Sequence, residues 1–197
     1  MIGTVIDDRF DQKYLYDLFS VVEELKYRAT NVANRRTWPF GYKGTHRLMG
    51  ATVFNRLSIN RILQLHPSAS HFFDLFEQIE NILGEQYFLS TIDVNLQHSG
   101  NHGSIHIDTN TGGCSYTHTI MFYPNPEWKK KWGGEFEIYS EDGKKVVEEY
   151  DYIPGRIILF ESSHPHRGLG PKIEYGDVYR YSIAFRGSPI LTQKLPK

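Results

Sequence analysis

The chain has 197 residues, 40% of them hydrophobic and 23% charged, which are the proportions of a folded globular protein and exclude a disordered chain. Its formal net charge of -1 provides no basic field for non-specific binding of nucleic acid. The single cysteine, Cys114, excludes an internal disulfide framework and a thiolate metal cluster, and it favours a reducing compartment, so we expect a cytoplasmic protein. The first residues resemble no signal peptide, and no apolar run is long enough for a membrane span.

The first part of the sequence favours helices. Apolar residues recur at helical spacing over residues 11–30, which predicts an amphipathic helix. A second helix is predicted over residues 70–83, where Gly84 provides the end. The apolar faces predict that both helices cover a sheet. Residues 31–67 contain scattered proline and glycine and predict a mixture of strand and loop.

The sequence after residue 86 favours strands. Seven short segments rich in β-branched and aromatic residues are separated by turn residues. They are residues 87–97, 104–107, 116–123, 134–139, 145–152, 156–160 and 178–185. This spacing favours a sandwich or jelly roll over alternating strands and helices. We therefore expect an α+β protein that is mainly β.

The candidate functional residues include the histidines of this strand-rich part. On a strand, His106 and Asp108 lie two residues apart and share a face, so an imidazole and a carboxylate can converge on one ion. A surface histidine beside a turn-forming aspartate is the alternative. Further along, a hydrophobic segment ends and is followed by His164 and His166. Two histidines and one carboxylate suit non-haem Fe(II), and the same donors also suit zinc.

The last predicted strand contains Arg180 and Ser182 on one face. An arginine that points into a hydrophobic interior needs an anionic partner, because an unpaired buried charge is costly. A planar guanidinium can pair with a carboxylate through two hydrogen bonds. The alternative is an ion pair with an aspartate or glutamate of the protein surface.

These motifs, with Gly133-Gly134-Glu135 between them, resemble in their order the 2-oxoglutarate- and Fe(II)-dependent dioxygenases, above all the prolyl 4-hydroxylase-like branch. The resemblance covers about residues 91–187. It implies a double-stranded β-helix (jelly-roll, cupin-like) core with N-terminal covering helices. We expect one domain over residues 1–197, with a mainly helical front at 1–86 and a jelly-roll core at 87–187.

The resemblance also implies the iron ligands. His106 and Asp108 match the first two ligands of the family. For the third ligand we favour His166, because the distal histidine of the family is followed within a few residues by a proline, here Pro171. His164 is the alternative.

Three more residues match the co-substrate site of the family, and the sequence departs from the family at Asn95-Leu96-Gln97, where many relatives have a tyrosine. Arg180 matches the residue that pairs with the distal carboxylate of 2-oxoglutarate, with Ser182 beside it. Tyr123 matches a position whose hydroxyl lies near the same carboxylate, and a barrel-lining aromatic without a ligand contact is the alternative. Asn95 or Gln97 can serve the keto-acid end.

The implied reaction uses Fe(II), 2-oxoglutarate and O2, with ascorbate as a candidate reductant. It hydroxylates a peptidyl residue such as proline, or a small molecule, and releases succinate and CO2. The carboxylate of Asp108 leaves no vacant position for a halide, so hydroxylation is expected rather than halogenation. The sequence does not specify the substrate or the oligomeric state.

Two other functions compete with this reading. Arg180 and Arg186 have the spacing found in the nucleic-acid dealkylating branch of the superfamily, although the near-neutral charge argues against nucleic acid. Without such a role, Arg186 is expected to be an exposed residue just past the end of the strand. The other alternative is a jelly-roll binding module without enzymatic activity.

Overall fold

The computed structural model describes residues 2–32, 47–56, 64–108 and 116–190. Cys114 and most of the segment predicted as mixed strand and loop lie outside these residues. The helices are α1 (Gln12–Glu23), α2 (Ala69–Leu83) and the short 3₁₀-helix η1 (Lys130–Trp132). The strands are β1 (Thr4–Ile6), β2 (Arg28–Val32), β3 (Arg47–Asn55), β4 (Gln64–Leu65), β5 (Tyr87–His98), β6 (His118–Phe122), β7 (Phe136–Tyr139), β8 (Val146–Tyr150), β9 (Ile157–Glu161), β10 (His166–Gly168) and β11 (Tyr179–Pro189).

Both predicted helices are present, and the first is shorter than predicted. The carboxylate of Asp11 caps α1 by accepting a hydrogen bond from the backbone N–H of Tyr14. The helix ends at Glu23 because residues 28–32 pair with β3, and this sheet pairing overrides the helical pattern that we extended to residue 30. Helix α2 ends as predicted at Gly84, whose φ of 70° is the left-handed conformation that favours glycine.

Six of the seven predicted strand segments form strands. The exception is 104–107, where His106 makes a single isolated bridge to His166. Conversely, the loop expected to contain His166 forms the short strand β10. The front of the chain is not mainly helical, because β1, β2, β3 and β4 also belong to it and join the large sheet.

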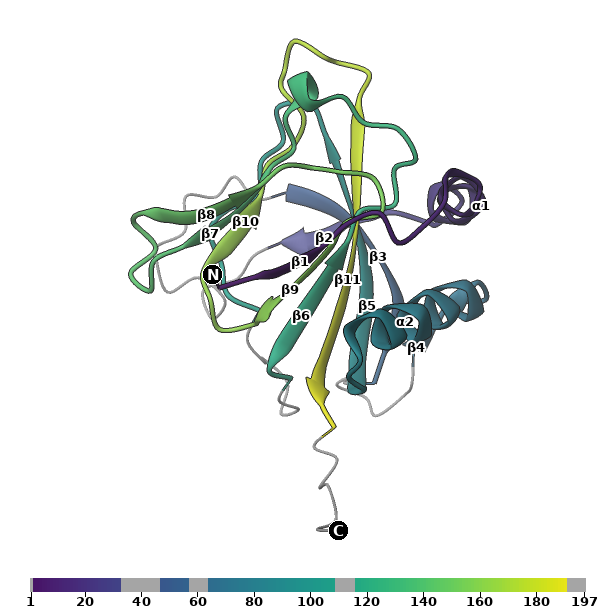
Figure 1. The fold of residues 1–197 in the computed structure, drawn as a ribbon. Coiled ribbons are helices and arrows are strands. Elements are labelled where there is room, and N and C mark those ends of the chain that lie inside the picture. Colours follow the sequence, from purple (N-terminus) through teal and green to yellow (C-terminus); the bar gives the residue numbers. More distant parts are fainter. Residues whose placement is uncertain (1, 33–46, 57–63, 109–115, 191–197) are drawn as a thin grey trace.

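The strands form two antiparallel sheets. The large sheet has the order β1-β9-β6-β11-β5-β3-β2, with β4 paired to β3, and the small sheet has the order β10-β7-β8. Both helices lie on one side of the large sheet and the small sheet lies on the other (Figure 1). This is the mainly β, jelly-roll architecture with covering helices that the sequence predicts.

The central strand β11 shows how the sheet separates its two sides. Tyr181, Ile183 and Phe185 pack into the hydrophobic core under the helices, whereas Ala184 packs into the second core beneath the small sheet. Side chains alternate along a strand, so Arg180, Ser182 and Arg186 also face the space between the two sheets. Polar groups of the candidate site therefore gather there.

Among the described residues, no helix combines the length and the apolar character that crossing a membrane requires.

Candidate functional site

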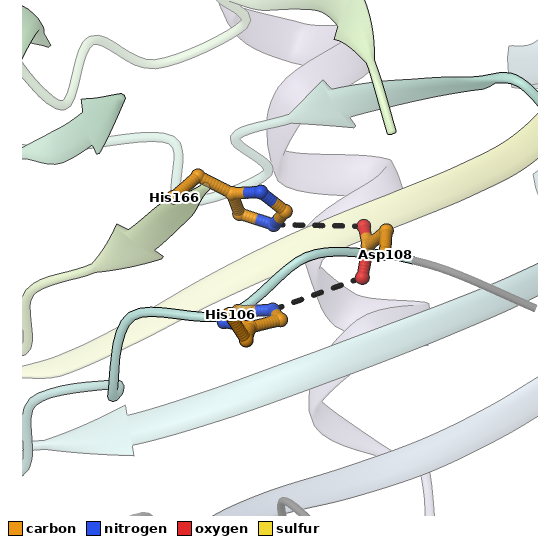
Figure 2. Close-up of side chains that lie close together, drawn as sticks. All are labelled: His106, Asp108 and His166. Carbon is orange, nitrogen blue, oxygen red and sulfur yellow. Dashed lines mark ion pairs between the residues drawn. The ribbon is translucent and has the colours of Figure 1, made fainter. Parts of the chain in front are cut away.

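The three predicted metal ligands lie together between the two sheets. His106 Nε2 is 3.7 Å from Asp108 Oδ1, and His166 Nε2 is 3.6 Å from Asp108 Oδ2. Figure 2 shows both imidazole rings directed at the carboxylate. One ligand atom from each residue lies within 4.8 Å of the others, so the set can hold one metal ion.

Backbone pairing, rather than a regular strand, brings these residues together. The N–H of His106 donates to the carbonyl of His166 at 2.9 Å, and the N–H of His166 donates to the carbonyl of His106 at 2.8 Å. The N–H of Asp108 donates to the carbonyl of Ser162, just after β9, at 2.9 Å. The expected strand over 104–107 is thus wrong, because the chain pairs with β10 only at His106 before it turns toward Ser162.

Each imidazole is held in the form that binds metals. His106 Nδ1 lies 2.9 Å from the carbonyl of Ser104, and His166 Nδ1 lies 2.8 Å from the carbonyl of His164. A carbonyl only accepts hydrogen bonds, so Nδ1 carries the proton and the Nε2 lone pair faces Asp108. Burial, and after it the charge of His106, lower the pKa of His166 to about 3, which keeps this ring neutral. His164 contributes its carbonyl, and its own ring is not part of the set.

Asp108 is buried and stays ionised. Burial by itself raises the pKa of this carboxyl, but the positive charge of Arg186, with smaller contributions from the neighbouring His166 and His106 imidazoles, outweighs burial and leaves the pKa well below its ordinary value. Thr119 Oγ1 donates a hydrogen bond to Asp108 Oδ2 at 2.9 Å. The site therefore offers two imidazole nitrogens and one carboxylate, the donor set that suits a non-haem Fe(II) ion and also accepts zinc.

Arg186 is not the exposed residue that we expected. Strand β11 continues to Pro189, so Arg186 lies within it, and its side chain is only 14% exposed. Its Nε forms an ion pair with Asp108 Oδ2 at 3.0 Å, without the alignment of a hydrogen bond. Its Nη1 donates to Asp93 Oδ2 at 2.9 Å.

A second cluster surrounds Arg180, which is 1% exposed. Its Nε donates to the carbonyl of Gly134 at 2.9 Å, its Nη1 donates to Gln97 Oε1 at 2.8 Å, and Ser182 Oγ lies 3.4 Å from the same nitrogen. No carboxylate of the described residues forms an ion pair with Arg180. The alternative of a surface ion pair is therefore wrong.

Two buried donors of this cluster lack a partner. Arg180 Nη2 and the Tyr123 hydroxyl form no hydrogen bond with any described residue, and the guanidinium carbon lies 5.1 Å from the centre of the Tyr123 ring. Leaving a donor buried and unsatisfied costs about 1–3 kcal/mol. Two such donors side by side, one of them cationic, fit a ligand carboxylate.

The remaining predicted residues lie on β5, across from Arg180 and Ser182 in the sheet register. Asn95 is opposite Ser182 and is buried. Gln97 is opposite Arg180, and its Nε2 donates to the carbonyls of Asn101 and Gly168, each at 3.0 Å. Of the two residues that we assigned to the keto-acid end, Gln97 is instead committed to holding the Arg180 guanidinium.

Sequence reasoning missed the supporting role of two other residues. Thr119 carries no pattern of its own on its strand, and only the fold places it against Asp108. Gly134 belongs to a motif that we noted without a role. Its φ is 89°, and a Cβ there would lie 2.8 Å from Trp128 Cζ2 and 3.3 Å from Arg180 Cδ. Glycine is thus required where the backbone passes Arg180.

Comparison with known families agrees with this geometry. Residues 92–185 match the model of the 2OG-Fe(II) oxygenase superfamily, and this stretch contains the three candidate ligands and Arg180. Over these residues the chain is similar to the 2OG-Fe(II) oxygenase superfamily. This similarity implies Fe(II) and 2-oxoglutarate, and it supports an enzyme over a binding module without enzymatic activity. No curated protein sequence matches this chain.

Solved structures show the same fold at low sequence identity. A 2OG-Fe(II) oxygenase from Burkholderia pseudomallei is 15% identical, with a TM-score of 0.67 over 95% of this chain and 85% of the other. A Trichoplax adhaerens prolyl hydroxylase, in complex with a hypoxia-inducible-factor peptide, is 17% identical, with a TM-score of 0.60 over 95% and 83%. The viral collagen prolyl hydroxylase of Paramecium Bursaria Chlorella virus-1 is 11% identical, with a TM-score of 0.60 over 94% and 95%.

Proposed function

We propose that the protein is an Fe(II)- and 2-oxoglutarate-dependent hydroxylase. It acts with O2 on a peptidyl residue such as proline, or on a small molecule, and it releases succinate and CO2. The observation that carries this proposal is the buried Arg180 guanidinium, which lies beside the Tyr123 hydroxyl with a donor unsatisfied in each group. Both donors face the space between the sheets that also holds the His106, Asp108 and His166 set.

The three ligand residues would hold iron on one face of the ion. Iron and 2-oxoglutarate, once bound, supply the oxidising chemistry. The tasks of the chain are to present both Nε2 atoms to the ion and to keep Asp108 ionised. The carbonyls of Ser104 and His164 perform the first task, because they place the ring proton on Nδ1 and leave Nε2 as the nitrogen that faces the ion. The charge of Arg186 performs the second.

The Arg180 cluster would bind the distal carboxylate of 2-oxoglutarate. Arg180 Nη2 and the Tyr123 hydroxyl would each donate to one of its oxygens, with Ser182 beside them. Because the cluster is buried, these hydrogen bonds would form in a low dielectric, where charge-assisted bonds are strong. Asn95, on the same face of the sheet, is our candidate for the keto-acid end.

A peptide substrate is supported by the fold of two relatives, one a prolyl hydroxylase in complex with a peptide and the other a collagen prolyl hydroxylase. The dealkylating alternative loses its main support, because Arg186 is paired with Asp108 and Asp93 and is thus committed to the protein. Ascorbate as reductant and a cytoplasmic location belong to the same proposal.

The decisive experiment is anaerobic reconstitution of the full chain with Fe(II) and 2-oxoglutarate, followed by admission of O2. We expect a visible metal-to-ligand charge-transfer band under anaerobic conditions and succinate after O2 is added. His106→Ala should abolish both signals. Arg180→Ala should weaken the band at limiting 2-oxoglutarate, and the band should return at high concentration.

Arg9→Ala is the matched control for Arg180→Ala, because Arg9 is an exposed arginine outside both clusters. It should behave as wild type. If the iron-loaded wild type shows neither band nor succinate, the oxygenase proposal is wrong. Repeating the reconstitution with zinc then shows whether the same three residues serve another metal.

A further inference from the structure

A groove of about 510 Å³ lies between α1, residues 125–132 and the start of β11. Tyr179 and Tyr181 line it, and they alternate along β11 with Arg180, which faces the opposite side of the sheet. The groove is therefore on the helix side of the large sheet, away from the candidate metal centre. Neither cluster of the proposed function contributes to it.

Aromatic side chains form much of the groove. Tyr16 and Tyr179 are 46% and 51% exposed, which is high for rings of this size. Trp128 and Trp132 meet edge to face, with ring centres 5.4 Å apart. The faces of such rings attract cations, and exposed tyrosine and tryptophan are typical of protein interfaces.

The charge of the groove is negative. Glu23, Glu127 and Asp177 line it, and none of the described residues that line it is a lysine, arginine or histidine. Glu127 accepts a hydrogen bond from the Tyr16 hydroxyl at 2.5 Å, a contact that leaves its charge uncompensated. Within the described part of the chain, no cation forms an ion pair with any of the three carboxylates.

None of the three lysines next to the groove forms an ion pair with its carboxylates. Lys130 forms an ion pair with Asp151 at 2.7 Å, and Lys131 lies over the ring of Tyr175 at 5.6 Å. Lys129 lies over the ring of Trp132, 5.3 Å from its centre. This last contact shows that a groove tryptophan already attracts a cation, while the carboxylates remain available for another one.

Hydrogen bonds fix the walls in place. Gln12 Nε2 donates to the carbonyl of Pro126 at 2.8 Å, which joins α1 to the loop. Asn125 Nδ2 donates to the carbonyl of Tyr179 at 3.0 Å, and Asn125 Oδ1 accepts from the N–H of Tyr181 at 2.9 Å. A groove whose walls are already ordered loses little entropy when a ligand binds.

We propose that this groove binds an arginine side chain presented by a polypeptide. A guanidinium stacks on aromatic faces and pairs with carboxylates through two hydrogen bonds, and an ammonium cannot do both. The exposed tyrosines at the rim provide contact area for the backbone on either side of the arginine. The proposal does not depend on the oxygenase reaction, because the groove is separate from both clusters of that site.

The test measures peptide binding by isothermal titration calorimetry on the metal-free full chain. The probe is the peptide Ac-Gly-Arg-Gly-Arg-Gly-amide, and its matched partner has citrulline, which is neutral and nearly the same shape, in place of arginine. We expect the arginine peptide to bind about tenfold more tightly than the citrulline peptide. The double variant Glu23→Gln, Asp177→Asn should weaken binding of the arginine peptide by a similar factor.

The control is Glu24→Gln, Glu77→Gln, which removes two exposed carboxylates outside the groove and should bind as wild type. Both double variants should retain wild-type succinate formation without substrate. Equal binding of the two peptides, or undiminished binding by the groove variant, would overturn the proposal. Equally tight binding of N-acetylarginine amide would show a small-molecule site and overturn the polypeptide part.

Discussion

The guanidinium of Arg186 forms an ion pair with the carboxylate of Asp108, with 3.0 Å between Nε and Oδ2. The same side chain bonds Asp93 on β5, so one cation holds two carboxylates from separate parts of the chain. The protein itself thus orients the carboxylate that we propose as a metal ligand. Thr119 adds a hydrogen bond to the same oxygen, Oδ2.

Replacing Arg186 by glutamine should destabilise the metal-free protein. The side chain of Asp108 is 8% exposed and would lose the only cation of fixed charge that pairs with it among the described residues. Removing one partner of a buried ion pair costs about 3 kcal/mol, so urea unfolding should show a loss of this size. Lys13→Gln is the control, since the side chains of its pair with Asp17 are 84% and 65% exposed, and it should leave the unfolding free energy close to that of wild type. Equal stability of the two variants would contradict the structural role of Arg186.

The stability of the metal-free protein should fall as pH drops below about 6.5. Burial and the charge of His106 lower the pKa of His166 to about 3, whereas a histidine in an unfolded chain has a pKa of about 6.5. Between these values the unfolded state takes up a proton that the folded state does not, so acid favours unfolding. Asp108, whose pKa is also lowered, contributes only below about pH 4.

His166→Gln isolates this effect, because it removes the titrating group. From pH 7.5 to 5, wild type should lose about 2 kcal/mol more unfolding free energy than the variant. The comparison is between the two pH dependences, so any constant cost of the substitution cancels. Parallel curves over this range would show that His166 takes up its proton as readily in the folded as in the unfolded state.

The sequence allows prediction of those site residues whose side-chain type and spacing along the chain both match a known kind of site. His106 and Asp108 are two residues apart, and His166 follows a hydrophobic segment, so their residue types are compatible with a metal site, and the resemblance to the dioxygenases selected them as ligands. Arg180 could be predicted because a charged residue in an otherwise hydrophobic strand requires an anionic partner. His106 and Asp108 do lie together, although they are not on the regular strand that we assumed. Backbone hydrogen bonds to β10 and to Ser162 bring them together instead.

The rest depended on tertiary contacts that leave no local pattern. Asp93 is 93 residues from Arg186, and nothing near either residue indicates their pairing. The end of α1 was also not readable, because we extended the predicted helix to residue 30, whereas residues 28–32 pair with the distant strand β3. The ends of strands and helices depend on the competition between local sequence pattern and pairing with distant strands. For this reason Arg186 was expected outside its strand.

Tyr123 and Tyr152 allow function to be separated from stability. Their rings stack with centres 4.2 Å apart. The Tyr123 hydroxyl has no partner among the described residues, whereas the Tyr152 hydroxyl bonds Asn125 Oδ1 at 2.6 Å and the carbonyl of Tyr181 at 2.8 Å. Tyr123→Phe should therefore weaken 2-oxoglutarate binding about tenfold with little change in stability.

Tyr152→Phe should do the reverse, with a loss of about 1–2 kcal/mol in unfolding free energy and unchanged binding of 2-oxoglutarate. The measurements are thermal unfolding of the metal-free protein and titration of the charge-transfer band with 2-oxoglutarate. If Tyr123→Phe destabilises the protein as much as Tyr152→Phe and leaves binding intact, its hydroxyl has a structural partner and no ligand role.

Gly134→Ala should damage both stability and co-substrate binding. At φ 89° the added Cβ would lie 2.8 Å from Trp128 Cζ2 and 3.3 Å from Arg180 Cδ, so the substitution combines backbone strain with overpacking. We expect a loss of about 2–4 kcal/mol in unfolding free energy, and weaker binding of 2-oxoglutarate in the titration of the charge-transfer band, because Arg180 must move.

Gly84→Ala is the control. Its φ is 70° and no atom lies within 4 Å of the added Cβ, so strain alone should cost about 1 kcal/mol. Equal costs at the two positions would mean that the space beside Arg180 is not restrictive.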